Sequence, residues 1–381
     1  MSATMSASAA SVHPLRPISF GNPAVTVERR DDGTIYLRPK LKLADFPVRL
    51  TDRLHHWANA EPNRVFMAER AGSDWRRISY AQLFEATRRI ASALIARGLS
   101  AERPIVILSG NSIDHALIAL GALYAGIPFC PVSPAYSLVS RDYGKLGYVI
   151  KLLTPGLVFV DDADKFADAL RANVAPEVEI AASRGAVPGR EVTRLADLMA
   201  TPEDGRLDAI HAAVGPDTIA KFLLTSGSTG NPKAVINTQR MICANQVMLR
   251  ETLAFLKDEP PVIVDWLPWN HTFGGNHNVG LTLYNGGSMY LDEGKPMPGG
   301  IEETVRNLRE ISPTVYFNVP KGYESLLPYL RDDADLRSKF FHRLHAMFFS
   351  GAALSPFVWN SLDALAVQEK GYRVPMLTGL G

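Results

Sequence analysis

Residues 220–240 of the sequence read AKFLLTSGSTGNPKAVINTQR. An apolar run ends at Thr225 and β-branched residues resume at Val235, so we expect a strand on each side of a loop rich in glycine and hydroxyl side chains. Glycines let the backbone N–H groups of such a loop turn inward, and hydroxyls and one ammonium add further donors. The stretch therefore predicts an anion-binding loop, and phosphate is the anion that it suits best.

Two other interpretations of this loop fit less well. A flexible linker would also be rich in Ser, Thr and Gly, but a linker has no reason to lie between two apolar strands. The common nucleotide-binding pattern G-x-x-x-x-G-K-[ST] is absent, because Pro232 precedes Lys233 and Ala234 replaces the hydroxyl residue that would hold magnesium. The full run T-S-G-S-T-G-x-P-K resembles instead the signature loop of the adenylate-forming superfamily, which includes acyl-CoA synthetases, firefly luciferase and the adenylation domains of peptide synthetases.

The resemblance implies a role for each residue of the loop. Hydroxyl side chains would hold phosphate oxygens, glycines would shape the loop, and the ammonium would meet the departing pyrophosphate. The residues in these three roles are Thr225, Ser226, Ser228 and Thr229, then Gly227 and Gly230, and finally Lys233. Thr225 and Lys233 are also the catalytic residues that we expect from this loop.

A second informative stretch is DWLPWNHTFGG, residues 265–275. Its pattern L-P-x-x-H-x-x-G resembles the acyl-pocket motif of the same superfamily. The resemblance implies that His271 borders the carboxylate of the substrate as a third catalytic residue, and that Phe273 and Trp269 line the pocket for the acid. A metal site at His271 and His277 is not expected, because no third ligand stands at a useful spacing.

Two later stretches complete the resemblance. In FSGAAL, residues 349–354, the small residues Gly351, Ala352 and Ala353 would let a flat ring approach the backbone, and their family equivalents line the adenine.

The last stretch is LTGLG, residues 377–381, and Gly379, Leu380 and Gly381 match the start of a further nucleotide-binding motif. In the family this motif continues with a Thr and a magnesium-binding Glu, and a C-terminal lid domain carrying an adenylation Lys follows. We therefore expect the large N-terminal domain of the adenylate-forming fold, with the C-terminal domain missing. The sequence leaves open whether this chain ligates or only binds nucleotide and acid.

Length and composition indicate a globular protein with more than one hydrophobic core. The chain has 381 residues, of which 46% are hydrophobic and 21% charged. Strand and helix patterns alternate along it, as at residues 105–132, which predicts parallel pairing. The expected fold class is α/β, with two packed subdomains and mostly parallel sheets. We expect a disordered tail over residues 1–19, a first subdomain over 20–214 and a second over 215–381.

Charge and cysteine content narrow the possible partners and location. A net charge of +1 gives no basis for binding nucleic acid. Cys130 and Cys243 have no metal or dithiol spacing, which favours a reducing cytoplasm. The apolar stretch 105–132 is interrupted by polar residues, so no membrane span or membrane partner is expected. The sequence does not indicate the oligomeric state.

The residues of these motifs are most similar to those of bacterial feruloyl-CoA synthetases. The resemblance implies a ligase that uses ATP, Mg2+ and coenzyme A to activate a small carboxylic acid, here a hydroxycinnamic acid such as ferulate. Gln239 stands where many members have His, which supports a distinct branch. The alternatives are a fatty-acyl or benzoate CoA ligase, or a catalytically incomplete fragment that binds nucleotide and acid.

Overall fold

The computed structural model describes residues 13–225 and 230–379 of the chain. It contains two compact units, and neither is continuous in sequence. The larger unit comprises Phe20–Pro261 and Trp266–Leu291. The smaller comprises Met1–Ser19, Val262–Asp265 and Asp292–Gly381. The subdomain boundary that we expect from the sequence stays a prediction.

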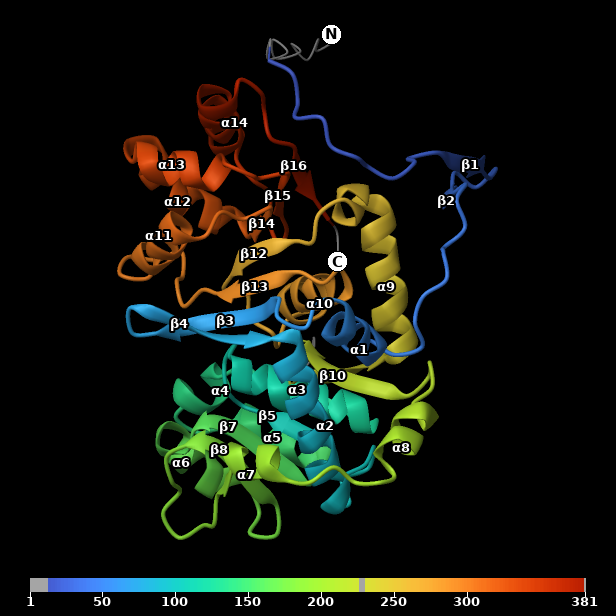
Figure 1. Ribbon diagram of the computed structural model, residues 1–381, viewed down its shortest axis with the longest axis vertical. Helices are drawn as coiled ribbons and strands as arrows, with labels where there is room; N and C mark the ends of the chain where they lie inside the picture. Colours follow the sequence, from blue (N-terminus) through green and yellow to red (C-terminus); the bar gives the residue numbers. More distant parts are fainter. Residues whose placement is uncertain (1–12, 226–229, 380–381) are drawn as a thin grey trace. The chain divides into compact units, whose positions relative to one another are not determined.

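A seven-stranded sheet forms the centre of the larger unit (Figure 1). Its strands, in spatial order, are β11 (Lys233–Thr238), β10 (Ile219–Thr225), β6 (Phe129–Pro131), β5 (Ile105–Ile107), β7 (Leu157–Asp162), β8 (Glu179–Arg184) and β9 (Thr193–Arg194). Only the β10–β11 pair is antiparallel, because a short loop joins these two strands. The mostly parallel α/β architecture expected from the sequence is confirmed.

Helices pack on the sheet according to the alternation of its side chains. Val106, Val158 and Ile180 share one apolar cluster with residues of α5 (Gly144–Leu153) and α6 (Ala163–Asn173). Successive side chains of a strand point to opposite faces, so Phe129 and Lys221, which pair across β6 and β10, lie away from that cluster.

The helix α2 (Tyr80–Ala96) begins with a capping box. Ser79 accepts a hydrogen bond from the backbone N–H of Gln82, and the Gln82 side chain accepts one from the backbone N–H of Ser79. The helix α2 packs on α3 (Ile113–Ala125) where Gly121 faces Ile90. A Cβ atom at Gly121 would collide with the Ile90 side chain, so only glycine permits this close approach.

The larger unit also contains a second sheet and further helices. A second sheet contains β3 (Val65–Ala71), β4 (Asp74–Ser79) and β13 (Ser288–Leu291), with β3 paired to both others. The other helices are α1 (Thr51–Ala60), α4 (Ala135–Leu138), α7 (Leu195–Ala200), α8 (Leu207–Ala213), α9 (Gln239–Thr252), the 3-10 helix η1 (Ala254–Lys257), the π-helix η2 (Phe273–Asn278) and α10 (Val279–Tyr284).

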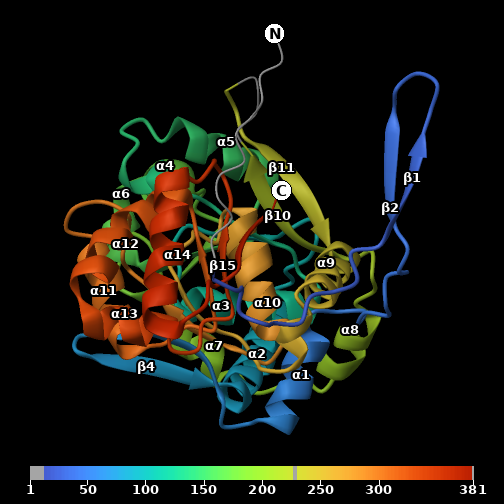
Figure 2. The ribbon, with the colours of Figure 1, turned by 90° about the horizontal axis from the view of Figure 1, so that it is seen from above.

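An exposed hairpin of β1 (Val25–Arg29) and β2 (Ile35–Pro39) stands apart from the helices of the larger unit (Figure 2). Its register places the apolar side chains of Val25, Val27, Ile35 and Leu37 on one face, and that face is exposed. The polar face carries an ion pair between Arg38 and Glu28 with an N–O distance of 2.6 Å.

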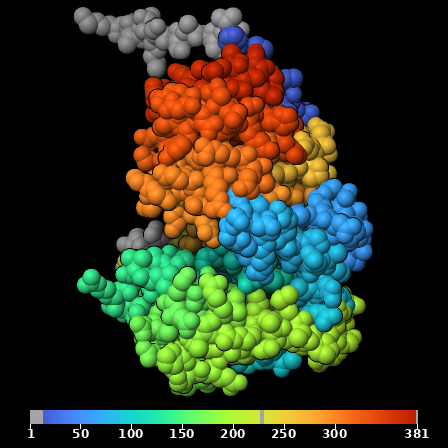
Figure 3. All heavy atoms as spheres, turned by 60° about the vertical axis from the view of Figure 1, so that its left-hand side comes forward, coloured from blue at the N-terminus to red at the C-terminus, as the bar shows by residue number. Residues whose placement is uncertain are grey.

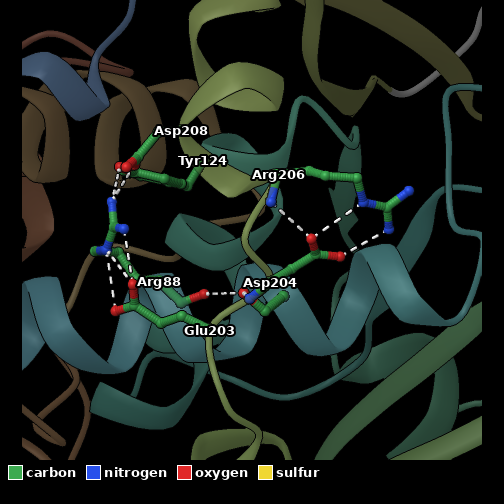
Figure 4. A network of polar contacts seen from close by, with 7 residues as sticks. Arg88, Tyr124, Glu203, Asp204, Arg206 and Asp208 are labelled. Carbon is green, nitrogen blue, oxygen red and sulfur yellow. Dashed lines mark hydrogen bonds and ion pairs between the residues drawn. The ribbon is translucent and has the colours of Figure 1, made fainter.

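A polar network holds α8 against α2 (Figure 4). Arg88 donates to both carboxylate oxygens of Glu203 at 2.7–3.0 Å, to Asp208 at 2.6 Å and to the Tyr124 hydroxyl at 2.7 Å. The backbone N–H of Asp204 donates to Ser92 at 3.0 Å. Three different segments of the larger unit therefore meet at one arginine.

The smaller unit contains a parallel sheet in the order β14 (Val315–Asn318), β15 (Ala346–Phe349), β16 (Met376–Thr378). Beside β14 lies β12 (Val262–Asp265). The helices are α11 (Ile301–Glu310), α12 (Pro320–Asp332), α13 (Ala334–Phe341) and α14 (Pro356–Lys370). Near the start of the chain, Leu15 forms a parallel bridge with Arg373. The segments after Asp292, coloured orange to red, gather in one continuous body (Figure 3).

The contact between α2 and α3 can be tested by filling the space that glycine leaves. We expect Gly121→Val to lower the free energy of unfolding by about 1–3 kcal/mol, because the added methyl groups overpack a closed interface. Gly205→Val is the matched control: a Cβ there meets no atom within 4 Å. Urea unfolding of both variants measures the difference, and equal stabilities would contradict the close packing.

Candidate active site

The predicted phosphate loop joins two strands whose register is now defined. Thr225, the last residue of β10, is paired directly with Lys233, the first residue of β11. Directly opposed residues of an antiparallel pair point to the same face, with Cβ atoms about 5 Å apart. Both residues are exposed, and Gly230 adopts a φ of +87° that favours glycine. Thr225 and Lys233 thus stand together at the end of the hairpin where the loop joins the two strands.

Four residues of the predicted phosphate loop lie outside the described residues: the predicted phosphate ligands Ser226, Ser228 and Thr229, and the loop-shaping Gly227. Their assignment stays a prediction of the sequence.

The second predicted motif folds into a turn followed by the π-helix η2. Gly274 and Gly275 lie so close to the preceding chain that a Cβ atom on either would collide with a backbone carbonyl, of Leu267 or Trp269 respectively. The glycine pair is therefore required for the chain to fold back on itself. A short π-helix is rare, and such turns are frequently found at functional sites.

His271 and Phe273 occupy the exposed side of this turn. The backbone N–H of His271 donates to the Pro268 carbonyl at 3.1 Å, and the imidazole Nδ1 accepts from the Phe273 N–H at 3.3 Å. The ring is therefore oriented by its own turn, and its Nε2 points away from this hydrogen bond. Phe273 is half-buried and its ring packs edge-on against His277. Trp269 is instead buried, only 5% exposed.

Three hydrogen bonds tie the turn to the elements around the phosphate loop. The Lys221 ammonium on β10 donates to the Gly275 carbonyl at 3.0 Å. Asn276 donates to the Asn237 side chain on β11 at 2.9 Å. Gln246 on α9 donates to the Asn276 carbonyl at 3.0 Å. The structure therefore brings the phosphate-loop hairpin and the histidine turn together within the larger unit.

Lys221 is a feature that sequence reasoning missed. It lies within an apolar strand and is only 5% exposed, and burial lowers the pKa of its ammonium to about 7. The signal in the sequence was a single lysine inside a run of apolar residues. From the sequence alone, such a lysine would be placed at the edge of a strand. Its burial can be recognised only once the neighbouring helices are known.

His115 on α3 lies beside Lys221 and Trp269. Its ring packs edge-on against the Trp269 ring, with 4.9 Å between centroids. Its Nδ1 bonds to the Gly110 carbonyl at 2.9 Å, and burial lowers the pKa of the imidazole to about 4. The ring is therefore neutral, with the proton on Nδ1, because a carbonyl only accepts.

The residues that the sequence predicts to line the adenine belong to the smaller unit. Gly351, Ala352 and Ala353 follow β15 and are exposed, and Gly351 has a φ of +90°. The Ser350 hydroxyl donates to the Gly379 carbonyl at 3.0 Å. The ends of β15 and β16 are adjacent, so these predicted residues lie at the same edge of a parallel sheet.

Leu380 and Gly381 lie outside the described residues. Within the described part of the chain, no three His, Cys, Asp or Glu side chains are grouped as a metal site would require. In the same part, no helix combines the length and apolar character needed to cross a bilayer.

The buried lysine predicts a pH-dependent stability. Between pH 7 and about 10, an unfolded lysine stays protonated while Lys221 in the folded chain is mostly neutral. The unfolded state then binds more protons, so the free energy of unfolding rises with pH, by up to about 1.4 kcal/mol per pH unit. Below pH 7 both states are protonated, and the contribution of Lys221 to this slope disappears.

Urea unfolding at several pH values, for the wild type and Lys221→Met, measures this difference. We expect the wild type to gain stability relative to the variant between pH 7 and 10. The exposed Lys165 gives the matched control, Lys165→Met, which should keep the wild-type slope. Parallel curves for wild type and Lys221→Met would show that Lys221 is protonated in the folded chain at these pH values.

Comparisons with protein families and with curated proteins both find enzymes similar to this chain. The family model of AMP-binding enzymes matches residues 54–372 of the chain. A long-chain-fatty-acid–CoA ligase, ACSBG2 of Xenopus laevis, is 24% identical over 310 residues, covering 75% of this chain and 40% of the relative. The human ligase ACSBG1 is 23% identical over 360 residues, covering 89% and 48%. The chain thus spans less than half the length of either relative.

Solved structures show the same fold. The VinN complex with L-aspartate has a TM-score of 0.65 at 22% identity, covering 85% of this chain and 74% of VinN. Apo MatB from Rhodopseudomonas palustris also has a TM-score of 0.65 at 22% identity, covering 87% and 59%. The fatty acyl-adenylate ligase from L. pneumophila, solved with acyl adenylate and pyrophosphate, has a TM-score of 0.64 at 18% identity, covering 85% and 53%.

Proposed function

The chain belongs to the AMP-binding enzyme family, and from this premise we propose that it activates a carboxylic acid with ATP and transfers the acyl group to coenzyme A. A carboxylate oxygen attacks the α-phosphorus of ATP, which forms the acyl-adenylate and releases pyrophosphate. The thiol of coenzyme A then attacks the acyl carbon, and AMP leaves. The observation that carries the proposal is the pairing of Thr225 with Lys233 at the mouth of the glycine-hydroxyl loop.

The described residues fit a phosphate-bearing ligand. The adenylation step places negative charge on phosphate oxygens, and a positioned hydroxyl and ammonium stabilise such charge without a covalent role. Thr225 supplies the hydroxyl and Lys233 the ammonium, and both are exposed to an incoming ligand. His271 borders the carboxylate of the acid, and Gly351, Ala352 and Ala353 line the adenine. Mg2+ would enter with the ATP phosphates and neutralise part of their charge.

The substrate that we propose is a hydroxycinnamic acid such as ferulate. The residues of the two motifs support it, and the half-buried aromatic side chain of Phe273 in the histidine turn is suited to packing on a flat ring. A second candidate is a long-chain fatty acid, which the names of the curated relatives favour. Neither of these two relatives is a feruloyl-CoA synthetase, so the ferulate proposal rests on the sequence motifs.

The role of Lys233 can be measured by the affinity of the chain for ATP. We expect Lys233→Ala to raise the ATP dissociation constant about 10- to 100-fold, because one charge-assisted hydrogen bond to phosphate is lost. Calorimetric titration measures the change. The control Lys165→Ala removes an equally charged, 62% exposed side chain from α6 and should leave the affinity unchanged. An unchanged constant in Lys233→Ala would remove this residue from the phosphate site.

The acid can be identified with a matched panel. If the pocket takes a flat aromatic acid, Phe273→Ala should weaken the binding of ferulate several-fold more than that of acetate or a medium-chain acid, because only ferulate packs along the ring. Phe357→Ala, a 74% exposed ring on α14, is the control. If Phe273→Ala weakens the binding of all three acids equally, Phe273 does not contact an aromatic ring of the substrate. Tighter binding of hexadecanoate than of ferulate to the wild type would favour the second candidate.

A further inference from the structure

The β1–β2 hairpin forms a sheet of its own. No other strand of the described chain pairs with β1 or β2, and Figure 2 shows both strands extending away from the helices of the larger unit. An isolated two-stranded hairpin is at best marginally stable in water, and it needs a third strand or a packed face to become stable. A surface that packs against this hairpin would therefore stabilise it.

One face of the hairpin is a continuous apolar surface. Val25 is paired with Pro39 and Val27 with Leu37, and Ile35 follows on the same face, because directly opposed residues share a face and successive residues alternate. The four aliphatic side chains are 44–64% exposed. Single exposed apolar side chains are ordinary, whereas an exposed apolar patch marks a site of interaction.

The opposite face is polar, and its side chains are paired with one another. Glu28 forms the ion pair with Arg38 at 2.6 Å. The guanidinium groups of Arg30 and Arg38 lie over the Tyr36 ring, 4.3 and 5.1 Å from its centroid. These contacts are complete within the hairpin, so the apolar face is the one available to a partner.

The two ends of the hairpin differ in charge. Residues 28–32, at the turn, include three acidic and two basic side chains, whereas residues 38–42, at the base, include three basic and no acidic ones. Asp31 at the turn, and Lys40 and Lys42 at the base, form no ion pair with any described residue. A second hairpin that lies antiparallel on the first brings each turn to the base of the other, where unlike charges meet. A parallel arrangement would bring like charges together.

We propose that the β1–β2 hairpin is a self-association surface, which packs its apolar face against the same face of a second copy of this chain, with the hairpins antiparallel about a two-fold axis. Such an interface is self-complementary, with Val27 and Leu37 of both copies at its centre. An anionic membrane fits the hairpin less well, because its surface would repel Asp31 and Asp32 at the turn. Association through this face does not depend on the proposed activity.

Sedimentation equilibrium over a range of protein concentrations tests the proposal. We expect a monomer–dimer equilibrium with a micromolar dissociation constant, because a few apolar side chains per partner make a small interface. Val27→Asp should raise this constant at least about 10-fold, since it places two like charges at the centre of the apolar contact. The matched control is Val139→Asp, at a 76% exposed valine that follows α4, and it should keep the wild-type constant.

Exchange of charge tests the antiparallel arrangement separately. One variant combines Asp31→Lys with Asp32→Lys, so both ends become basic, and the other combines Lys40→Asp with Lys42→Asp, so both ends become acidic. At low salt, each variant alone should dissociate about 10-fold more readily than the wild type, because like charges meet at both ends. A mixture of the two variants should associate as tightly as the wild type, since unlike ends meet again. Association of the mixture also shows that both variants are folded.

Three results would overturn the proposal. The first is a wild type that stays monomeric at every concentration. The second is a dimer whose dissociation constant does not change in Val27→Asp. The third is a pair of charge variants that associate no better when mixed than alone. If the monomeric wild type instead cosediments with phosphatidylglycerol vesicles, and Val27→Asp abolishes that binding, the apolar face binds lipid and the proposal is wrong.

Discussion

The hydrogen bond from the Lys221 Nζ to the Gly275 carbonyl, 3.0 Å long, connects the two motifs on which the candidate site depends. Lys221 belongs to the strand that enters the phosphate loop, and Gly275 belongs to the turn that carries His271. The bond lies in a buried, apolar environment, where an unpaired polar group is costly and a satisfied one fixes geometry. It therefore holds the loop and the turn in one arrangement before any ligand binds.

The glycine pair of the histidine turn serves the same arrangement. The Gly275 carbonyl reaches Lys221 only because residues 274 and 275 lack a Cβ atom and fold closely onto Leu267 and Trp269. Asn276 then reaches the second strand of the hairpin through Asn237. Both strands that flank the phosphate loop are thus bonded to consecutive residues of one turn. A site built on such rigid connections needs little reorganisation when a ligand binds.

Much of this structure could be predicted from local sequence patterns. The two strands that flank the predicted phosphate loop and the mostly parallel α/β architecture follow from apolar periodicity and the alternation of elements, and both are confirmed. The β1–β2 hairpin was not predicted, because charged residues and prolines obscure its two short apolar rows. The discontinuous composition of the two units could not be predicted either, since it depends on long-range contacts.

The burial of Lys221 illustrates why the environment of a side chain could not be predicted from the sequence. Its neighbours along the chain indicate a strand, but its environment is set by α3 and by the turn near Gly275, which are distant in sequence. The same holds for Trp269. The sequence assigns it to the substrate pocket, and the structure packs its ring against His115 in the lining of a small buried cavity. Motifs identify residue types and order, whereas packing decides which of their atoms face a ligand.

Acid-dependent exchange of labelled pyrophosphate into ATP tests the central claim most directly, because exchange requires reversible formation of the acyl-adenylate. The account predicts that label enters ATP when the chain, Mg2+, ATP and a suitable acid are present together, and that omission of the acid abolishes the exchange. A chain that binds ATP and acid but catalyses no exchange with ferulate, benzoate or hexadecanoate would contradict the account and leave a binding protein in its place.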